Sequence, residues 1–253
     1  MVVTMNWRII LVEEHNAFLN MAIDEAISES VAQGKSLPTI RFYTWKPSAV
    51  SIGCFQSMGD EIDTNICKNL GVDAVRRRTG GGAVYHDNLG EITYSVIAPQ
   101  AMFPSNIVES YKVICGWIID SLALLSVSAD FIPINDIVTS GKKISGNAQT
   151  RRNGILLQHG TILYAVDVKK MFSLLKVPSE KIRDKMIATV EERVTSIKRQ
   201  NPEITKEKLC EALLKGFTNN KKYSFGKLSK EEFNRAKELV EIRYSTREWN
   251  FSR

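Results

Sequence analysis

Residues 76–87 read Arg-Arg-Arg-Thr-Gly-Gly-Gly-Ala-Val-Tyr-His-Asp, and the rest of the sequence is organised around them. Three consecutive glycines lack a Cβ and reach positive φ, so neighbouring backbone N–H groups can turn toward one guest. The arginines before them favour the oxygens of a carboxylate or a phosphate. For the glycines alone, a glycine-rich turn beside a solvated basic strand is the alternative. Arginines, glycines, a histidine and an aspartate within one short stretch predict an anion-binding site.

This glycine stretch lacks the features of the common nucleotide loops. No Gly-Lys-Ser/Thr follows it, so it is not a P-loop, and no Gly-x-Gly-x-x-Gly opens a helix, so a dinucleotide fold is not indicated. Residues 91–97 then alternate apolar and polar side chains, as a strand does. We therefore expect the glycines to join two strands, with the anion site made of hairpin backbone instead of a helix N-terminus.

Composition limits the class of protein and its partners. The 253 residues are 43% hydrophobic and 25% charged, which is ordinary for a globular domain with a large core. No apolar run reaches the length of a membrane span and the N-terminus lacks a signal-peptide pattern, so we expect a cytoplasmic protein with no membrane partner. The net charge of +6 favours an acidic protein domain or a phosphate-bearing ligand. No basic–aromatic array predicts nucleic-acid binding.

The four cysteines are scattered without a Cys-x-x-Cys pair. We therefore predict free thiols, largely buried, and neither a zinc site nor a disulfide framework.

Hydrophobic periodicity predicts a mixed α/β (α+β) fold. Strands are expected over 7–12, 39–45, 49–53, 73–78, 91–97, 136–139, 142–146 and 155–164. Helices are expected over 16–34, 63–69, 106–126, 167–175 and 205–217, with another starting at a capping box at residue 229. Ser105 is the expected N-cap of the longest helix, Glu25 is expected on a solvated helix face, and Phe55 is expected in the core.

A second group of polar residues lies about sixty residues after the first. It comprises Asn135-Asp136, the segment 141–148 (Gly-Lys-Lys-Ile-Ser-Gly-Asn-Ala) and His159-Gly160-Thr161. Ser140-Gly141 predicts a hairpin turn between two short strands. Lys142 and Lys143 are adjacent in a strand, so they point to opposite faces, and one of them can face inward.

Together the two groups resemble the signature of lipoate–protein ligase A and its relatives, which is Arg-Arg-x-Ser/Thr-Gly-Gly-Gly-Ala-Val-x-His-Asp followed by Asn-Asp, Lys-Ile/Val-Ser-Gly-x-Ala and His-Gly-Thr. The resemblance covers nearly the whole chain. It implies the biotin/lipoate ligase fold, which is like that of class II aminoacyl-tRNA synthetases, with mixed and antiparallel sheets flanked by helices. It implies one catalytic domain over 1–253 with a helical C-terminal portion. It selects Lys143 as the inward, catalytic lysine, and it makes the strands over 39–45 and 49–53 the walls of an acyl tunnel.

The same resemblance implies an ATP-dependent ligase. Lipoate or octanoate would be activated to an acyl-AMP and transferred to a lysine of lipoyl carrier domains, namely the E2 subunits of 2-oxoacid dehydrogenases and the H protein of glycine cleavage. ATP chemistry normally brings Mg²⁺, and Asp136 is the nearest matching carboxylate. The residues implied for lipoate and ATP are Arg77, Gly80, Gly81, Gly82, Ala83, Val84, Tyr85, His86, Asn135, Asp136, Lys143, Ser145, Gly146, Ala148, His159, Gly160 and Thr161.

Three alternatives compete with a ligase. An octanoyl or lipoyl acyltransferase of the same superfamily works through a cysteine thioester and needs a thiolate near the glycine stretch. Asn135-Asp136 stand where that cysteine is expected, and only Cys54 is near the presumed acyl wall, so the ligase is favoured. A biotin ligase would carry a Gly-Arg-Gly-Arg-type loop, which is not seen. A non-enzymatic module that binds lipoyl carriers has no use for Lys143.

Many ligases of this family carry a separate small C-terminal domain that helps to close the active site. Residues 244–250 resemble the end of the family's large domain. We therefore expect the large catalytic domain alone, of the bipartite type, with a second small polypeptide supplying the accessory domain.

Overall fold

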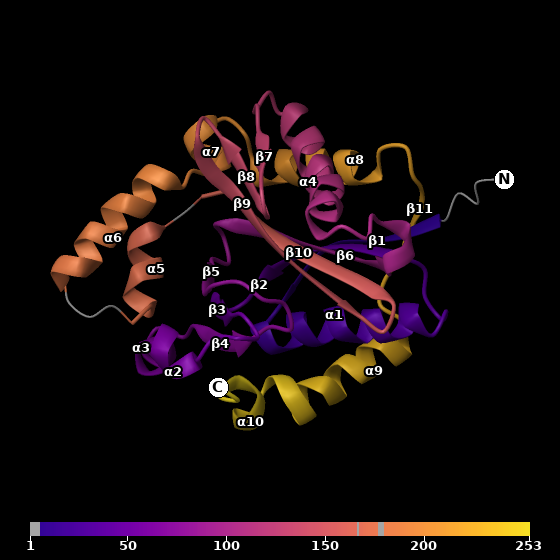
Figure 1. Ribbon diagram of the computed structural model, residues 1–253, viewed down its shortest axis with the longest axis horizontal. Coiled ribbons are helices and arrows are strands. Elements are labelled where there is room, and N and C mark those ends of the chain that lie inside the picture. Colours follow the sequence, from indigo (N-terminus) through magenta and orange to yellow (C-terminus); the bar gives the residue numbers. More distant parts are fainter. Residues whose placement is uncertain (1–5, 166, 177–179) are drawn as a thin grey trace.

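The computed structural model describes residues 6–165, 167–176 and 180–253. Within these residues the larger of two sheets has eight strands in the order β11-β1-β2-β6-β10-β9-β8-β7, and the smaller has three in the order β4-β3-β5 (Figure 1). Strand β1 runs parallel to both its neighbours, whereas the other pairs of the large sheet are antiparallel. The strands are β1 (Asn6–His15), β2 (Thr39–Trp45), β3 (Ala49–Ile52), β4 (Asp73–Arg76), β5 (Val84–His86), β6 (Glu91–Pro99), β7 (Asp130–Ile132), β8 (Asp136–Thr139), β9 (Lys142–Arg152), β10 (Ile155–Leu163) and β11 (Lys222–Phe225).

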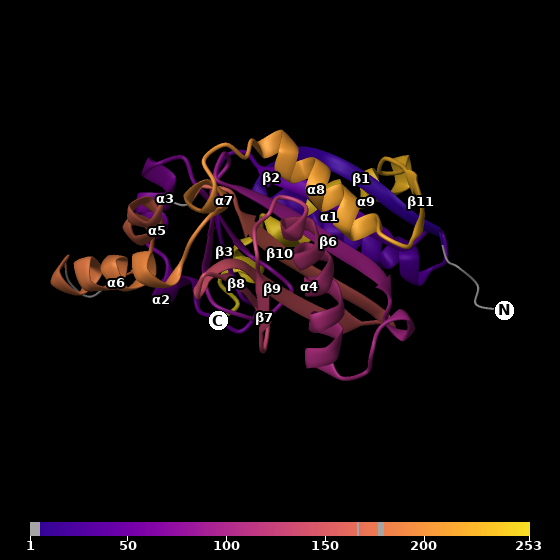
Figure 2. The same cartoon turned by 90° about the horizontal axis from the view of Figure 1, so that it is seen from above.

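Helices cover both faces of the large sheet, so the predicted fold of mixed sheets flanked by helices is confirmed (Figures 1 and 2). The α-helices are α1 (Ala17–Ala32), α2 (Met58–Glu61), α3 (Thr64–Asn69), α4 (Ile107–Ala123), α5 (Val168–Leu174), α6 (Glu180–Arg193), α7 (Ile197–Gln200), α8 (Lys206–Thr218), α9 (Lys230–Leu239) and α10 (Arg247–Asn250). A short 3-10 helix η1 (Gln100–Met102) and a π-helical turn η2 (Val240–Tyr244) complete the described elements. None of the described helices is long and apolar enough to cross a membrane.

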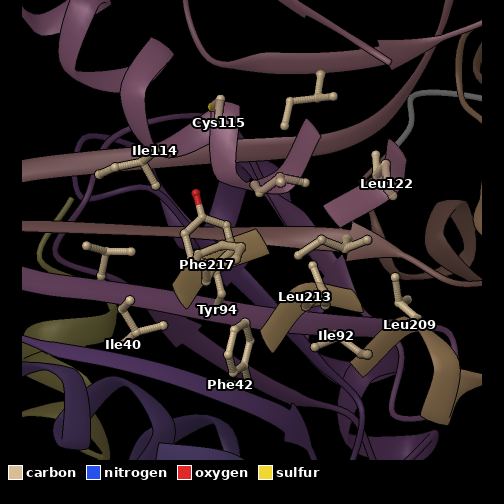
Figure 3. Packing of buried hydrophobic residues seen from close by; sticks show 14 of the residues in the cluster. Ile40, Phe42, Ile92, Tyr94, Ile114, Cys115, Leu122, Leu209, Leu213 and Phe217 are labelled. Atoms are coloured by element: carbon tan, nitrogen blue, oxygen red, sulfur yellow. The ribbon is translucent and has the colours of Figure 1, made fainter. Parts of the chain in front are cut away.

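The larger core lies between one face of the large sheet and the helix pair α4 and α8 (Figure 2). Phe217 of α8 stands at its centre, with ring centroids 5.2 Å from Phe42 and 5.0 Å from Tyr94 in edge-on contacts (Figure 3). Such contacts add to the free energy that burial of the rings supplies. Even-numbered residues of β2, such as Ile40 and Phe42, face this core because strand side chains alternate.

The opposite face of the large sheet carries α1, which α9 covers in turn (Figure 1). Helix α1 begins where predicted, because the Asn16 side chain accepts a hydrogen bond from the N–H of Leu19 at 2.9 Å. The capping box at the start of α9 is also present, with Ser229 and Glu232 exchanging hydrogen bonds.

The prediction that Glu25 faces solvent is wrong. Glu25 is only 3% exposed, because the C-terminal segment packs on α1 and encloses its side chain. Glu25 binds Arg78 at 2.8 Å, and it also binds Arg243 and the hydroxyl of Tyr244. Sequence periodicity shows only that Glu25 lies beside the apolar stripe of α1, and a partner some two hundred residues away decides its burial.

Two further expectations are corrected. Phe55 is 72% exposed and not part of the core; the guanidinium of Arg253 lies 5.4 Å from the centre of its ring. Helix α4 begins one residue later than expected, with Asn106 as its N-cap instead of Ser105, because the Asn106 side chain accepts from the N–H of Glu109. The amide oxygen of an asparagine suits that bond as well as the hydroxyl of a serine does.

The glycine stretch does not form a hairpin. Strands β4 and β5, which it joins, do not pair with each other but lie on either side of β3, one parallel to it and one antiparallel. The stretch therefore crosses over the end of β3, where Gly53 follows. A Cβ on Gly53 would overlap the carbonyl of Gly81, so the crossing depends on glycine beneath as well as within the loop.

Candidate active site

A cavity of about 340 Å³ lies where the small sheet meets strands β2, β6, β9 and β10, with α5 and the end of α6 beside it. Its size suits a small-molecule ligand. The predicted site residues that line it are Arg77, Gly81, Gly82, Ala83, Val84, Tyr85, His86, Asn135, Lys143, Gly146, Ala148, His159, Gly160 and Thr161. The other predicted residues, Gly80, Asp136 and Ser145, stand outside the lining. The structure thus brings both sequence groups together around one space.

Arg77 holds the glycine loop from beneath. Its guanidinium makes five hydrogen bonds, two of them from Nη2 to the carbonyls of Gly80 and Gly82 at 2.8 Å each. An arginine has five N–H donors, so all of them are used inside the protein. Burial lowers the pKa of Arg77 to about 10, which still leaves it a cation at neutral pH. Arg77 therefore shapes the glycine loop and places a positive charge beneath it.

The backbone N–H groups of the three loop glycines are unpaired in the described part of the protein. Within the described part of the chain, no acceptor takes the N–H of Gly80, Gly81 or Gly82. Gly81 has a φ of +99°, and a Cβ there would stand 2.9 Å from Nη2 of Arg77. A glycine with positive φ is one of the backbone features that anion-binding nests use.

The two flanking arginines serve the fold. Arg76 donates to the carbonyls of Gln56 at 2.6 Å, Trp249 at 2.9 Å and Asn250 at 3.0 Å, and so ties the C-terminal turn to the small sheet. Arg78 pairs with Glu25 on α1. Neither side chain lines the cavity.

Lys143 is the only lysine among the described residues that line the cavity. Its Nζ lies 2.6 Å from Oδ1 of Asp136, and its side chain crosses Gly146, where a Cβ would meet Cε at 2.8 Å. Lys142 points elsewhere, toward the carbonyl of Glu191 at 3.4 Å. The ammonium of Lys143 is held by one carboxylate only and is 40% exposed at its side chain, so it is able to follow an incoming anion.

A resident metal site is not built around Asp136. Its carboxylate is engaged by Lys143, and among the described residues no three His, Cys, Asp or Glu side chains gather as metal ligands. The donor set around Asp136 therefore does not fit a preformed protein site for Mg²⁺.

The second sequence group is held together by a pair of amide side chains, of which sequence reasoning predicted Asn135 as a site residue but missed Asn147. Asn135 and Asn147 donate to each other's backbone carbonyl, and the Asn147 Oδ1 accepts from the hydroxyl of Tyr94 at 2.6 Å. Asn147 lies across Gly160, where a Cβ would overlap its Oδ1. Gly160 is therefore required for close approach and not for a turn. The i, i+2 spacing of Ser145 and Asn147 along a strand is the pattern in the sequence that could have indicated Asn147 as a site residue.

Tyr43 and Trp45 line the cavity from β2, which is one of the two strands expected to wall the acyl tunnel. They alternate with the core-facing Ile40 and Phe42 along that strand. Sequence reasoning missed the other apolar lining residues, which are Met21, Leu163, Ala165, Met171, Val190 and Val194. For Val190 and Val194 the reason is that only tertiary packing brings the end of α6 over β9.

No cysteine is among the described lining residues. Burial raises the pKa of Cys67 to about 11 and that of Cys115 to about 12, so both stay as thiols at neutral pH. Cys54 is half-buried and outside the cavity lining, and its N–H donates to the carbonyl of Thr79 at 2.9 Å. Cys210 is half-buried in α8.

The lipoyl protein ligase A/B catalytic domain family matches residues 16–218. This chain belongs to that family. Two solved structures resemble this lipoyl ligase A/B domain closely. A bi-partite lipoate protein ligase from Thermoplasma acidophilum is 33% identical, with a TM-score of 0.88 over 98% of this chain and 96% of that one. A lipoate-protein ligase A bound with ATP is 29% identical, with a TM-score of 0.83 over 98% and 99%.

A curated relative of this ligase A/B domain carries a different activity in its name. The octanoyltransferase LipM of Brevibacillus brevis is 38% identical over 98% of this chain and 99% of that protein. The predicted family and fold are thus confirmed, and the chain is an enzyme of lipoate-type protein modification. The names of the curated relatives favour the transferase alternative over the ligase.

Proposed function

We propose that this chain is an ATP-dependent lipoate–protein ligase. The observation that carries the proposal is a cavity with unpaired glycine N–H groups and Lys143 but no thiol among its described lining residues. A thioester mechanism needs a nucleophilic sulfur at the acyl group, whereas an adenylate mechanism needs anion donors only.

The proposed chemistry has two steps. In the first, a carboxylate oxygen of lipoate or octanoate attacks the α-phosphorus of ATP, and pyrophosphate leaves. In the second, the neutral amine of a carrier lysine attacks the acyl carbon, AMP leaves, and the amine's proton is released. Both steps place anionic oxygens together, and the N–H groups of the glycine loop with the ammonium of Lys143 would offset that repulsion. One such donor is worth about 3 kcal/mol in the transition state.

Magnesium would enter with the nucleotide in this proposal. Mg²⁺ is commonly held by substrate phosphates and few protein oxygens, which agrees with the absence of a ligand cluster among the described residues. The structure of an ATP-bound lipoate-protein ligase A, which this chain resembles, supports nucleotide use.

We further propose the partners of this reaction. The bi-partite ligase of Thermoplasma acidophilum is described with an E2 lipoyl domain, and this supports lipoyl carrier domains, including E2 subunits and the H protein, as acceptors. The same likeness supports a second small polypeptide that docks on this catalytic domain, here residues 1–253, and completes lipoate activation. Alone, the chain would bind lipoyl-adenylate and transfer its acyl group, but activate lipoate slowly.

An octanoyltransferase is the second candidate, because curated relatives of similar length carry that name. It would take octanoyl from a carrier protein onto a cysteine sulfur and pass it to a second carrier, without ATP. Among the four cysteines, Cys54 is the one whose backbone N–H donates to residue Thr79, directly before the three glycines. This alternative must therefore use the thiol of Cys54.

The two candidates separate in one assay with a lipoyl domain as acceptor. We expect octanoyl or lipoyl transfer from synthetic acyl-adenylate, and ATP-dependent pyrophosphate release that a small accessory polypeptide accelerates. Transfer from octanoyl carrier protein without ATP, with no reaction of acyl-adenylate, would establish the transferase and refute the ligase. Rapid ATP-dependent lipoylation by this chain alone would instead refute the need for a partner.

A further inference from the structure

Two buried chains of hydrogen-bonding groups meet at Arg77. The first begins at Asp24 of α1, whose Oδ2 lies 3.6 Å from Nδ1 of His159 on β10. Nε2 of His159 lies 2.8 Å from the hydroxyl of Thr79, and that hydroxyl accepts from Nε of Arg77 at 3.1 Å. Thr79 is fully buried at 0% exposure. A carboxylate, an imidazole and a hydroxyl thus stand in line behind the guanidinium.

The second chain repeats this order with different residues. Oε1 of Glu91 lies 2.8 Å from Nδ1 of His86, and Nε2 of His86 lies 2.8 Å from the hydroxyl of Ser51. That hydroxyl accepts from Nη1 of Arg77 at 3.2 Å. Nη2 of Arg77, which neither hydroxyl engages, holds the carbonyls of Gly80 and Gly82.

The hydrogen-bond partners of Thr79 favour one arrangement of protons in the resting state. Its hydroxyl oxygen accepts from Arg77, and among the described residues Nε2 of His159 is the acceptor within hydrogen-bonding distance of the hydroxyl proton, which would otherwise be buried without a partner. That nitrogen must then be bare, and in a neutral ring the proton sits on Nδ1, which faces the carboxylate of Asp24. A second proton on His159 would make Nε2 a donor, and the buried Thr79 hydroxyl would lose its acceptor.

We propose that His159 and Thr79 are positioning residues for the anion site, and that only neutral His159 holds Arg77 and the glycine loop in the shape that presents the loop's N–H groups. The inference rests on the proposed function in taking the glycine loop as the ligand's anion site. His86 and Ser51 brace the other side of the same guanidinium. The charged and titratable groups that face His159 are Asp24 of α1, Arg77 after β4 and His86 of β5.

Burial agrees with this assignment. It lowers the pKa of His159, and the proximity of Asp24 only partly opposes that effect. The imidazole is therefore neutral at pH 7, and acid converts it to the form that breaks the chain.

The test compares a matched set of variants by calorimetry with 5′-O-(N-lipoylsulfamoyl)adenosine, a stable analogue of lipoyl-AMP. Thr79→Val removes the hydroxyl at constant shape, Thr79→Ser restores it, and Thr218→Val removes a buried hydroxyl from α8 as the control. We expect Thr79→Val to weaken binding about tenfold or more, with Thr79→Ser and the control within about threefold of wild type. Binding by folded Thr79→Val within about threefold of wild type overturns the proposal.

Imidazole ¹⁵N NMR of the wild type gives an independent measurement if Thr79→Val does not fold. The chain has three histidines, so His159→Gln assigns the resonance directly. We expect Nε2 to be unprotonated and Nδ1 to carry the proton at pH 7. We also expect the wild type to lose affinity for the analogue as the pH falls, and the His159→Gln variant to lose less. A protonated Nε2 at pH 7 overturns the proposal. Failure of wild type to bind the analogue would instead count against the proposed function, and the NMR result would still decide the state of His159.

Discussion

The carbonyl of Gly81 lies directly over Cα of Gly53, in the space that any side chain on Gly53 would need. The first residue belongs to the loop that we propose as the anion site, and the second follows the central strand of the small sheet. The proposed anion site is therefore built on the end of β3, and its shape depends on contact between two stretches some twenty-eight residues apart in the chain.

Glycine substitutions beneath and within the loop should have the same effect on ligand binding. Gly53→Ala forces the Gly81 carbonyl to move, and Gly81→Val places a β-branched residue at a φ of +99° beside Arg77. We expect both to abolish measurable binding of the lipoyl-adenylate analogue while the protein stays folded. Gly59→Ala, where a Cβ meets nothing within 4 Å, is the control. Near-normal affinity in Gly81→Val would remove the loop from the site.

Alanine substitution of Lys143 and of Lys142 should have very different effects on the rate in a single-turnover assay. Lys143→Ala removes the ammonium that Asp136 holds at the cavity, and we expect loss of both adenylate formation and transfer, by about a hundredfold or more. Lys142→Ala removes a contact with the Glu191 carbonyl outside the cavity and should leave rates within about twofold. Equal losses for the two variants would contradict the assignment.

Turnover should not depend on cysteine. None of the described lining residues is a cysteine, so replacement of all four by alanine is expected to keep the rate of acyl transfer from acyl-adenylate within a few-fold. Cys115→Ala creates a small void in the large core, so folding is checked by circular dichroism before the assay. Complete loss in the folded Cys54→Ala single variant would point to the thioester route.

Acid should destabilise the protein through His159 and Asp24. Burial lowers the pKa of His159, and the nearby imidazole of His159, the Arg41 guanidinium and the Ser95 hydroxyl keep the pKa of Asp24 low despite burial. Both groups bind protons more weakly when folded, so the unfolded state takes up protons first and stability falls with falling pH. The His159 part is fully present above its unfolded pKa of about 6.5 and is lost below it.

The measurement is the free energy of unfolding by urea from pH 7.5 to pH 5. Wild type should lose up to about 1.4 kcal/mol per pH unit more than His159→Gln in the acidic range, because one fewer group titrates in the variant. Parallel curves for the two proteins would show that His159 is not titrating there.

The C-terminal turn should contribute to stability through Asn250. Its side chain accepts from the N–H of Arg76 at 2.8 Å and donates to the carbonyls of Tyr244 and Thr246. Asn250→Ala leaves buried groups without partners, and we expect a loss of about 1–3 kcal/mol in unfolding free energy. Asn65→Ala, at an exposed position of α3, should cost much less. A similar loss of unfolding free energy in both variants would show that the hydrogen bonds of Asn250 do not stabilise the fold.

Features set by neighbouring residues were predictable from sequence. The Asn16 cap, the Ser229 capping box and the turn at Ser140-Gly141, where both residues have positive φ, each depend on a few adjacent side chains. The strand alternation that separates Lys142 from Lys143 is equally local. The two sequence groups that carry the family resemblance also converge on one cavity, as expected.

Tertiary structure alone decided what the polar residues do. By itself the sequence determined many of the elements and the family, and it predicted an anion site, because these follow from short-range geometry and from motifs. It did not show that Arg76, Arg77 and Arg78 are all bound within the protein, that Glu25 is buried, or that β3 separates β4 from β5. The physical reason is that a buried charge takes its role from partners distant in sequence, and only the packed chain brings those partners within hydrogen-bonding distance.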